Sequence, residues 1–345
     1  MAMSQDRYSR QQNFAPIGTG GQQALADSHV LMIGAGALGS GNAELLARAG
    51  VGTMTIIDRD YVEWSNLQRQ SLYCEQDAID QLPKAVAAAR RLKQINSELT
   101  VHAHVMDCNA ADLQNLLERN QFDLILDATD HFAVRYMIND AAYRYGIPWI
   151  YGACSGSYGA VCGFLPGQTP CLHCLMKRMP MVSASCDLEG IIGPAVQMVV
   201  SMQSAEALKW LSGNRTQMSD RFTVFDLWTN MHQSIGLGMM GRNNACPTCG
   251  EQPSYPYLQS DAAVRAEVLC GRTSVWLRHP RQEPLDLELI TLHAKHLRAE
   301  VKANPYLIQI QEGEQRLVIF LDGRALVHGT SDPLEAKKLY HRYIS

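Results

Sequence analysis

Residues 28–69 of the chain read SHVLMIGAGALGSGNAELLARAGVGTMTIIDRDYVEWSNLQR and carry its clearest pattern. An apolar run over 29–33 leads into a Gly-x-Gly-x-x-Gly turn, then into a run of small residues, and then into a second apolar run that ends at Asp58. This order predicts strand, glycine turn, helix and strand, in which N–H groups of the turn face a phosphate and the acid faces a ribose hydroxyl. By itself the pattern predicts a nucleotide site, most commonly for NAD or FAD.

The polar residues beyond this turn do not suit a redox cofactor. Hydride transfer needs no concentration of cations, whereas a nucleoside triphosphate carries negative charges that must be neutralised at the α-phosphorus and at the leaving pyrophosphate. Arg69 and Lys84 suit that task, and Asp130, which follows the apolar run 122–126, suits Mg²⁺. For each residue alone the alternative is a surface ion pair. An ATP site is favoured because five polar residues are expected at crevice-facing positions: Asp58, Asn66, Arg69, Lys84 and Asp130.

Length and composition limit the class of protein. The 345 residues are 46% hydrophobic, which predicts two cores: a large α/β domain over 1–254 and a small α+β domain over 255–345. The net charge of −4 and the absence of any Lys/Arg block argue against a nucleic-acid partner. No apolar run approaches the roughly 20 residues that cross a bilayer, so we expect no membrane contact and a soluble, cytoplasmic protein.

Alternating strands and helices predict a doubly wound, mostly parallel, Rossmann-like sheet in the large domain. The further elements expected there are strands at 101–106, 122–126, 149–152 and 222–227 and helices at 84–94, 110–119, 132–145 and 194–211. In the small domain we expect a strand at 273–278, a helix at 285–297, a three-stranded meander at 306–311, 316–321 and 324–328, and a last helix from 331. The Asp-Gly pair at 322–323 predicts a hairpin turn in the meander.

The cysteine spacing predicts a metal site. Cys171 and Cys174 form one Cys-x-x-Cys pair, and Cys246 and Cys249 form another. Four thiolates make a closed tetrahedral Zn²⁺ site with no open position for water, so its predicted role is structural. The alternative is two unrelated pairs of buried thiols.

The order of several short motifs along residues 7–250 resembles that of one enzyme family. The motifs are RYSRQ at 7–11, the glycine turn at 34–39, DRD at 58–60, SNLQRQ at 65–70, PK at 83–84, ATD at 128–130 and the two Cys-x-x-Cys pairs. Together, and in this order, they resemble the MoeB/ThiF adenylyltransferases, bacterial relatives of the ubiquitin-activating enzymes. No single motif is decisive, whereas the ordered set is specific.

The resemblance implies a role for each matched position. The implied contacts are Asp58 to the ATP ribose, Gly34, Gly36 and Gly39 to the nucleotide, Asn66, Arg69 and Lys84 to the phosphates, Asp130 to Mg²⁺, and Cys171, Cys174, Cys246 and Cys249 to Zn²⁺. Arg10 resembles the arginine that family members insert into the site of the neighbouring subunit, which implies a homodimer. Without the resemblance, Arg10 would be interpreted as part of a solvated helix face.

The resemblance also implies a reaction. The substrate would be a ubiquitin-like sulfur-carrier protein, ThiS-like or MoaD-like, whose C-terminal glycine carboxylate attacks the α-phosphorus of ATP, for thiamin thiazole or molybdopterin biosynthesis. Such a carboxylate has a pKa of about 3.3–3.7, so it is ionised at neutral pH and needs no general base. Two alternatives stay open: adenylation of a peptide C-terminus in ribosomal-peptide modification, and a non-catalytic dinucleotide-binding module.

Two further assignments follow from the family. Cys186 matches a cysteine of the crossing loop that joins the carrier terminus covalently in parts of the family, and the alternative is an inert loop cysteine. Residues 255–345 exceed the short bacterial members; similar extensions accompany some relatives from Bacillus-type bacteria. We expect an accessory domain there, for docking the carrier or a sulfur donor such as a cysteine desulfurase.

Overall fold

The computed structural model describes residues 7–178, 190–241, 243–259, 266–268, 273–277 and 284–344. The chain forms two compact units, one of residues 1–79 and 83–260 and the other of residues 80–82 and 261–345. Among the described residues, none of the helices combines the length and the hydrophobicity that a membrane span requires.

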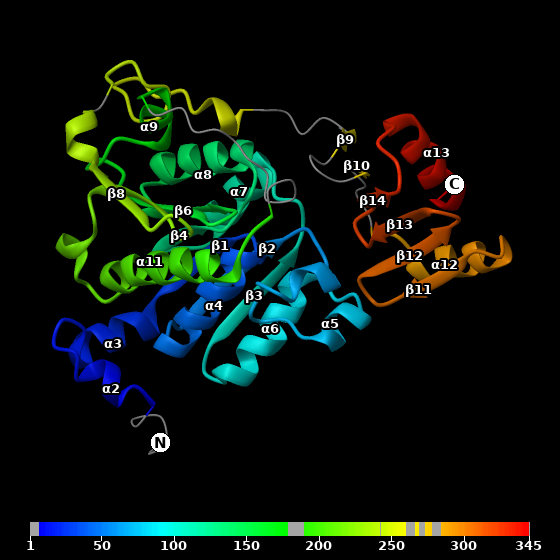
Figure 1. The fold of residues 1–345 in the computed structure, drawn as a ribbon, viewed down its shortest axis with the longest axis horizontal. Helices are drawn as coiled ribbons and strands as arrows, with labels where there is room; N and C mark the ends of the chain where they lie inside the picture. Colours follow the sequence, from blue (N-terminus) through cyan, green and yellow to red (C-terminus); the bar gives the residue numbers. More distant parts are fainter. Residues whose placement is uncertain are drawn as a thin grey trace. The chain divides into compact units, whose positions relative to one another are not determined.

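The first unit is built on an eight-stranded sheet of order β3-β2-β1-β4-β5-β6-β7-β8 (Figure 1). The strands are β1 His29–Ile33, β2 Thr53–Asp58, β3 Thr100–Val105, β4 Leu124–Asp127, β5 Trp149–Ser155, β6 Tyr158–Phe164, β7 Arg221–Asp226 and β8 Met231–Gly236. Neighbouring strands along the run β3-β2-β1-β4-β5 pair in parallel, and neighbouring strands along β5-β6-β7-β8 pair antiparallel. The prediction of a doubly wound, mostly parallel sheet is confirmed, while β6 and β8 were not predicted.

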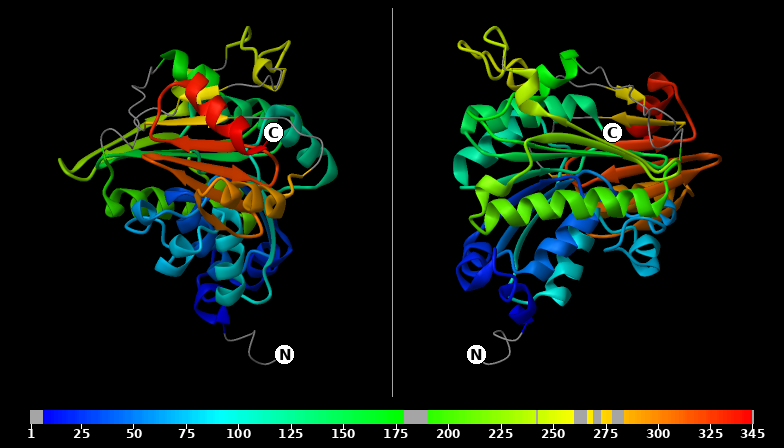
Figure 2. Two further views of the ribbon diagram at one scale, coloured as in Figure 1. Left: turned by 90° about the vertical axis from the view of Figure 1, so that its right-hand side faces the viewer. Right: turned by 60° about the vertical axis from the view of Figure 1, so that its left-hand side comes forward.

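Helices cover both faces of this sheet (Figures 1 and 2). One face carries α4 Ala37–Ala49, α6 Lys84–Ile95 and α11 Gly193–Leu211, and the other carries α7 Ala110–Arg119 and α8 Phe132–Tyr145. The remaining helices of the unit are α2 Ser9–Gln12, α3 Gly18–Asp27, α5 Glu75–Ile79 and α9 Leu172–Arg178, with short 3-10 turns η1 Trp64–Asn66, η2 Arg215–Gln217, η3 Leu237–Met240 and η4 Pro256–Leu258. The core beneath α7 and α8 contains Trp149, Tyr151 and Phe164, all fully buried.

The first unit extends past the expected domain boundary at residue 254. The ring of Tyr257 stacks on that of Tyr136 of α8 at 4.8 Å, and Gln114 of α7 donates a hydrogen bond to the carbonyl of Leu258. These contacts bring η4 against α7 and α8, so the chain just beyond residue 254 packs on the first unit.

The second unit is a six-stranded antiparallel sheet of order β11-β12-β13-β14-β10-β9 with two helices. Its elements are β9 Ala266–Val268, β10 Ser274–Leu277, α12 Leu287–His296, β11 Glu300–Ala303, β12 Leu307–Glu312, β13 Gln315–Phe320, β14 Ala325–His328 and α13 Pro333–Ile344. The predicted meander is confirmed as β12, β13 and β14, and Gly323 turns between the last two with φ of 84°. Apolar side chains of the sheet, α12 and α13 form one core.

Candidate functional site

The glycine turn between β1 and α4 is shaped by close backbone contacts. Gly34 has φ of 96°, and a Cβ there would overlap the carbonyl of Ala128 at the end of β4. A Cβ at Gly39 would overlap the carbonyl of Gly34. A Cβ at Gly36 would meet only Gln70 Nε2, at 4.0 Å, so Gly36 leaves open space at the first turn of α4. Two of the predicted glycines therefore close the turn, and the third leaves room for a ligand above the helix N-terminus.

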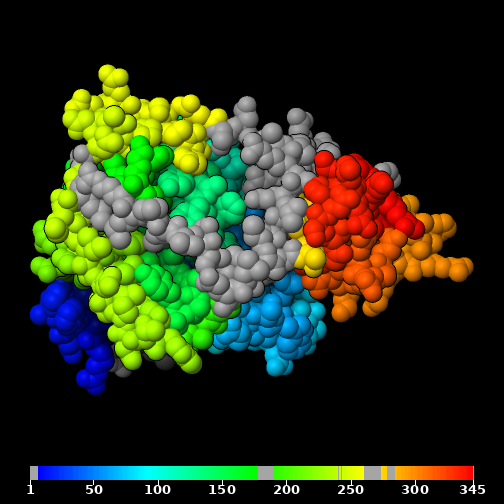
Figure 3. All heavy atoms as spheres, turned by 45° about the horizontal axis from the view of Figure 1, so that its top comes forward, coloured from blue at the N-terminus to red at the C-terminus, as the bar shows by residue number. Residues whose placement is uncertain are grey.

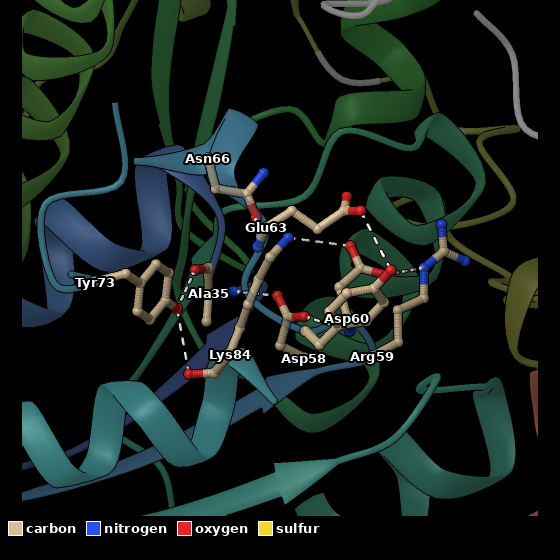
Figure 4. Close-up of polar contacts among 9 residues, drawn as sticks. Ala35, Asp58, Arg59, Asp60, Glu63, Asn66, Tyr73 and Lys84 are labelled. Atoms are coloured by element: carbon tan, nitrogen blue, oxygen red, sulfur yellow. Dashed lines mark hydrogen bonds and ion pairs between the residues drawn. The ribbon is translucent and has the colours of Figure 1, made fainter. Parts of the chain in front are cut away.

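Asp58, at the end of β2, is held by the backbone around it. Its Oδ2 accepts a hydrogen bond from Ala35 N at 2.6 Å, and its Oδ1 accepts one from Asp60 N at 2.7 Å (Figure 4). Burial raises the pKa of Asp58, while Lys84 opposes that shift. Each carboxylate oxygen can accept a second hydrogen bond, so the group retains acceptors for two hydroxyls.

Lys84 begins α6 and is buried, with 7% of its surface exposed. Its Nζ lies 3.2 Å from Asp60 Oδ2 (Figure 4). Burial lowers the pKa of Lys84, but Asp60, Asp58 and, more weakly, Asp130 outweigh that effect, and the pKa lies above its ordinary value. The site therefore contains a fixed, nearly dehydrated cation, and the influence of Asp130 indicates that this exposed carboxylate lies close enough to act on Lys84.

Asn66 is the last residue of η1, and Arg69 lies on the turn that follows it. Asn66 Oδ1 accepts a hydrogen bond from Glu63 N at 3.0 Å, which fixes the side-chain amide against η1. The side chain is labelled in Figure 4. Arg69 Nη1 donates to the carbonyl of Ser65 at 2.8 Å, within the same turn. Both side chains thus present N–H donors from one rigid loop, which a phosphate accepts readily.

Two residues at this site were missed by the sequence analysis. Tyr73 OH donates a hydrogen bond to Ala35 O at 2.6 Å and also lies 3.2 Å from Lys84 O, so this hydroxyl joins the glycine turn to the start of α6. Arg135 of α8 is 5% exposed; its Nε lies 3.3 Å from Asp127 Oδ2 and its Nη2 donates to Thr129 O at 2.7 Å. No local sequence pattern predicts either residue, because their partners are backbone carbonyls and a carboxylate that become neighbours only in the folded chain.

The loop that presents Asp130 is fixed by that ion pair. Asp127 Oδ1 accepts hydrogen bonds from both the N–H and the hydroxyl of Thr129, at 2.9 and 2.7 Å. Arg135 also donates to Gly152 O at 3.2 Å, which links β4 to β5. Asp130 itself is exposed, as a carboxylate that meets a hydrated cation should be.

Arg10 lies apart from these residues. It is exposed on α2, and its neighbour Gln11 donates to the carbonyl of Ala49 at the C-terminal end of α4. Helix α4 has 13 residues, which is about 20 Å at 1.5 Å per residue, and the glycine turn is at its other end. Arg10 therefore does not belong to the nucleotide site of its own chain.

The four predicted metal ligands are brought together. All four Sγ atoms lie within 4.8 Å of one another, with Cys171 and Cys246 at 3.5 Å and Cys174 and Cys249 at 3.5 Å. A tetrahedral Zn²⁺ with Zn–S bonds of about 2.3 Å places its sulfurs about 3.8 Å apart, so the cluster fits this ion. Helix α9 begins at Leu172, within the first Cys-x-x-Cys pair. Figure 3 shows this green helix beside the yellow segment that contains the second Cys-x-x-Cys pair.

Hydrogen bonding from the thiol of Cys171 lowers the pKa of Cys249, and a thiolate is the form of cysteine that binds a metal ion. Cys186, the other cysteine with a predicted role, lies outside the described residues.

Comparison with known proteins identifies the family. The model of the ThiF family matches residues 8–248, more than half of the chain. The chain belongs to the ThiF family. A sulfur carrier protein ThiS adenylyltransferase of Bacillus subtilis is 47% identical over 98% of this chain and 99% of its own length. A sulfur carrier protein adenylyltransferase of Thermus thermophilus is 35% identical over 77% of this chain and 96% of its own length.

Solved structures confirm the fold of this ThiF family chain. Escherichia coli MccB, in a crystal structure with succinimide, superposes with a TM-score of 0.59 at 23% identity, over 71% of this chain and 74% of MccB. At that identity the likeness concerns the fold alone.

Proposed function

We propose that the chain is an ATP-dependent adenylyltransferase that transfers AMP to the C-terminal glycine carboxylate of a ThiS-like, ubiquitin-like sulfur-carrier protein and releases pyrophosphate, for thiamin thiazole biosynthesis. The observation that carries the proposal is the 47% identity with the Bacillus subtilis ThiS adenylyltransferase, which extends over 98% of the chain and so includes the second unit. A MoaD-like carrier, for molybdopterin biosynthesis, is the alternative within the same reaction.

The predicted residues take complementary roles in this reaction. Asp58 accepts the ribose hydroxyls, and the open face of Gly36 lets the nucleotide approach the N-terminus of α4. Arg69, Lys84 and the Nδ2 of Asn66 donate to the phosphates. Asp130 would hold Mg²⁺, which neutralises charge on the leaving pyrophosphate.

Catalysis then rests on positioning and charge. The attacking carboxylate is already ionised at neutral pH, so no residue has to remove a proton. Lys84 is held in place before ATP binds by its ion pair with Asp60, so little reorganisation is needed when negative charge moves toward the leaving group. The same pre-organisation explains why the site is rich in fixed N–H donors.

Two assignments complete the proposal. Arg10 is exposed, and about the whole length of α4, roughly 20 Å, separates it from the glycine turn of its own chain. This position supports a homodimer in which Arg10 enters the nucleotide site of the neighbouring subunit. Cys186 would accept the activated carrier terminus, and a cysteine desulfurase would supply the sulfur.

Pyrophosphate exchange tests the reaction. We expect labelled pyrophosphate to enter ATP only when a carrier ending in Gly-Gly is present, and a carrier lacking its last glycine serves as the control. A ThiS-like carrier should support exchange and a MoaD-like carrier should not; the reverse result would reassign the carrier. Absence of exchange with both carriers would contradict the proposed reaction.

The metal assignment has its own test. We expect the chain purified without chelator to contain about one zinc per chain by elemental analysis, held by Cys171, Cys174, Cys246 and Cys249. Cys249→Ser should lower that content severalfold, because a hydroxyl is a far weaker ligand than a thiolate. The matched variant Cys74→Ser changes an exposed cysteine outside the cluster and should leave the zinc content unchanged. Zinc-free protein would contradict the assignment.

A further inference from the structure

Two consecutive side chains of α8, Asn139 and Asp140, reach both metal-binding segments. Both residues are fully buried. Asn139 Oδ1 accepts a hydrogen bond at 2.9 Å from the backbone N–H of Leu172, which lies between the cysteines of the first pair. A side-chain amide thus fixes the backbone of this segment at the residue next to Cys171.

Asp140 contacts the second pair. Its Oδ1 accepts a hydrogen bond at 2.5 Å from the hydroxyl of Thr248, a residue that lies between Cys246 and Cys249 and is 1% exposed. Its Oδ2 accepts another from the N–H of Tyr257 at 2.9 Å, so the chain beyond the second pair is anchored by the same carboxylate. One side chain therefore fixes the second segment at two points.

The second segment is also constrained from within. Gly250 N donates to Cys246 O at 3.0 Å, and a Cβ at Gly250 would overlap the backbone of Asn244 and Cys246. This tight turn orients the two cysteines relative to each other, but it does not orient them toward the first pair. The contacts with α8 relate one segment to the other through a shared helix.

These contacts are energetically demanding. A buried polar group costs free energy unless it is hydrogen-bonded, and a buried carboxylate is more costly than a neutral amide. Neither Asn139 nor Asp140 is among the residues placed at the nucleotide site. Their buried position is explained by the two segments that they hold.

We propose that Asn139 and Asp140 are positioning residues for the metal site: each holds one Cys-x-x-Cys segment, so that the four sulfurs are gathered before a metal ion binds. The inference rests on the proposed zinc site and not on the proposed reaction. A site organised by the protein releases its ion slowly, because loss of the ion does not free the ligands to move apart. Partners outside the ligand set commonly change metal affinity by about 10–100-fold.

Zinc release to a chromogenic chelator, followed on the full zinc-loaded chain well below its unfolding temperature, tests this inference. Asp140→Asn replaces one of the two acceptor oxygens with a donor, and Thr248→Val removes the hydroxyl at nearly constant volume. We expect each to accelerate release by about 10-fold. Because both changes alter the contact between Asp140 and Thr248, their effects on the release rate should be less than additive in the double variant.

Asp226→Asn is the matched control. Asp226 also accepts hydrogen bonds from a hydroxyl, that of Ser157 at 2.6 Å, and from a backbone N–H, that of Trp228 at 2.9 Å, but it lies on β7. A general loosening of the first unit would accelerate release in this variant too, and that result would overturn the inference.

Release at the unaltered rate in Thr248→Val, the mildest variant, would also overturn it. Neither result bears on pyrophosphate exchange, which is measured separately. The proposed reaction and the proposed positioning role can therefore fail independently.

Discussion

We expect Lys84→Met to reduce the rate of carrier-dependent pyrophosphate exchange by about 10²–10³-fold, the usual cost of removing one pre-organised donor from a developing negative charge. Lys84 is 7% exposed and is held 3.2 Å from Asp60, so its ammonium acts in a site with little water to screen it. The carboxylates of Asp60 and Asp58 keep its pKa above the ordinary value despite burial. The cation is therefore present throughout the neutral range, and methionine preserves most of the side chain's volume.

Lys93→Met, on the same helix, separates this effect from a general loss of lysine. Lys93 donates only to the carbonyls of Ser97 and Leu99 at the far end of α6. Its variant should retain the exchange rate within about twofold, since surface substitutions away from a site change stability by no more than about 0.5 kcal/mol. Equal losses in the two variants would exclude Lys84 from the site.

The parts of the fold that the sequence predicts well are those with a strong local pattern. The apolar runs that became β1, β2 and β4 are buried by helices on both sides, and their order alone implies a parallel sheet. Strand β6 lacked such a pattern because Gly159 and Gly163 interrupt it. A Cβ at Gly159 would overlap the ring of Phe225 on β7, so tertiary packing requires this glycine. Strand β8 lies at the edge of the sheet, where alternation is weak.

The residues of the candidate site also differ in how well the sequence predicts them. Charged residues at the carboxyl ends of strands, such as Asp58 and Asp130, follow from the strand pattern. Arg135 and Asp140 lie inside a predicted helix, where charged residues usually face solvent. Their burial depends on partners such as Asp127 and Thr248, which only the folded chain brings near them.

We expect Arg135→Met to destabilise the first unit by about 3–5 kcal/mol, the usual cost of removing one partner of a buried ion pair. Asp127 has no exposed surface, and the variant leaves its carboxylate without its cation. The carbonyls of Thr129 and Gly152 lose a donor as well. Hydrogen exchange of peptides covering β4 and β5 should report this loss as faster labelling. Arg144→Met, which changes an exposed arginine of the same helix, should leave the labelling of these peptides unchanged.

The Arg135→Met defect should also depend on pH. Burial raises the pKa of Asp127, and in the native chain Arg135 and the hydrogen bonds of Thr129 oppose that shift. Without Arg135 the pKa of Asp127 in the folded state rises further. A carboxyl group whose pKa is higher in the folded than in the unfolded state stabilises the folded state at low pH, and this contribution is lost as the pH rises through the folded-state pKa. The deficit should therefore be larger at pH 8 than at pH 5. Asp127→Asn combined with Arg135→Met removes both charges. The stability deficit of this double variant relative to the unaltered chain should therefore depend little on pH over this range, and its stability should exceed that of Arg135→Met at pH 8. A defect of equal size at both pH values would show that the loss arises from packing around Phe132 and Tyr151, whose rings lie about 5 Å from the guanidinium, and not from the stranded carboxylate.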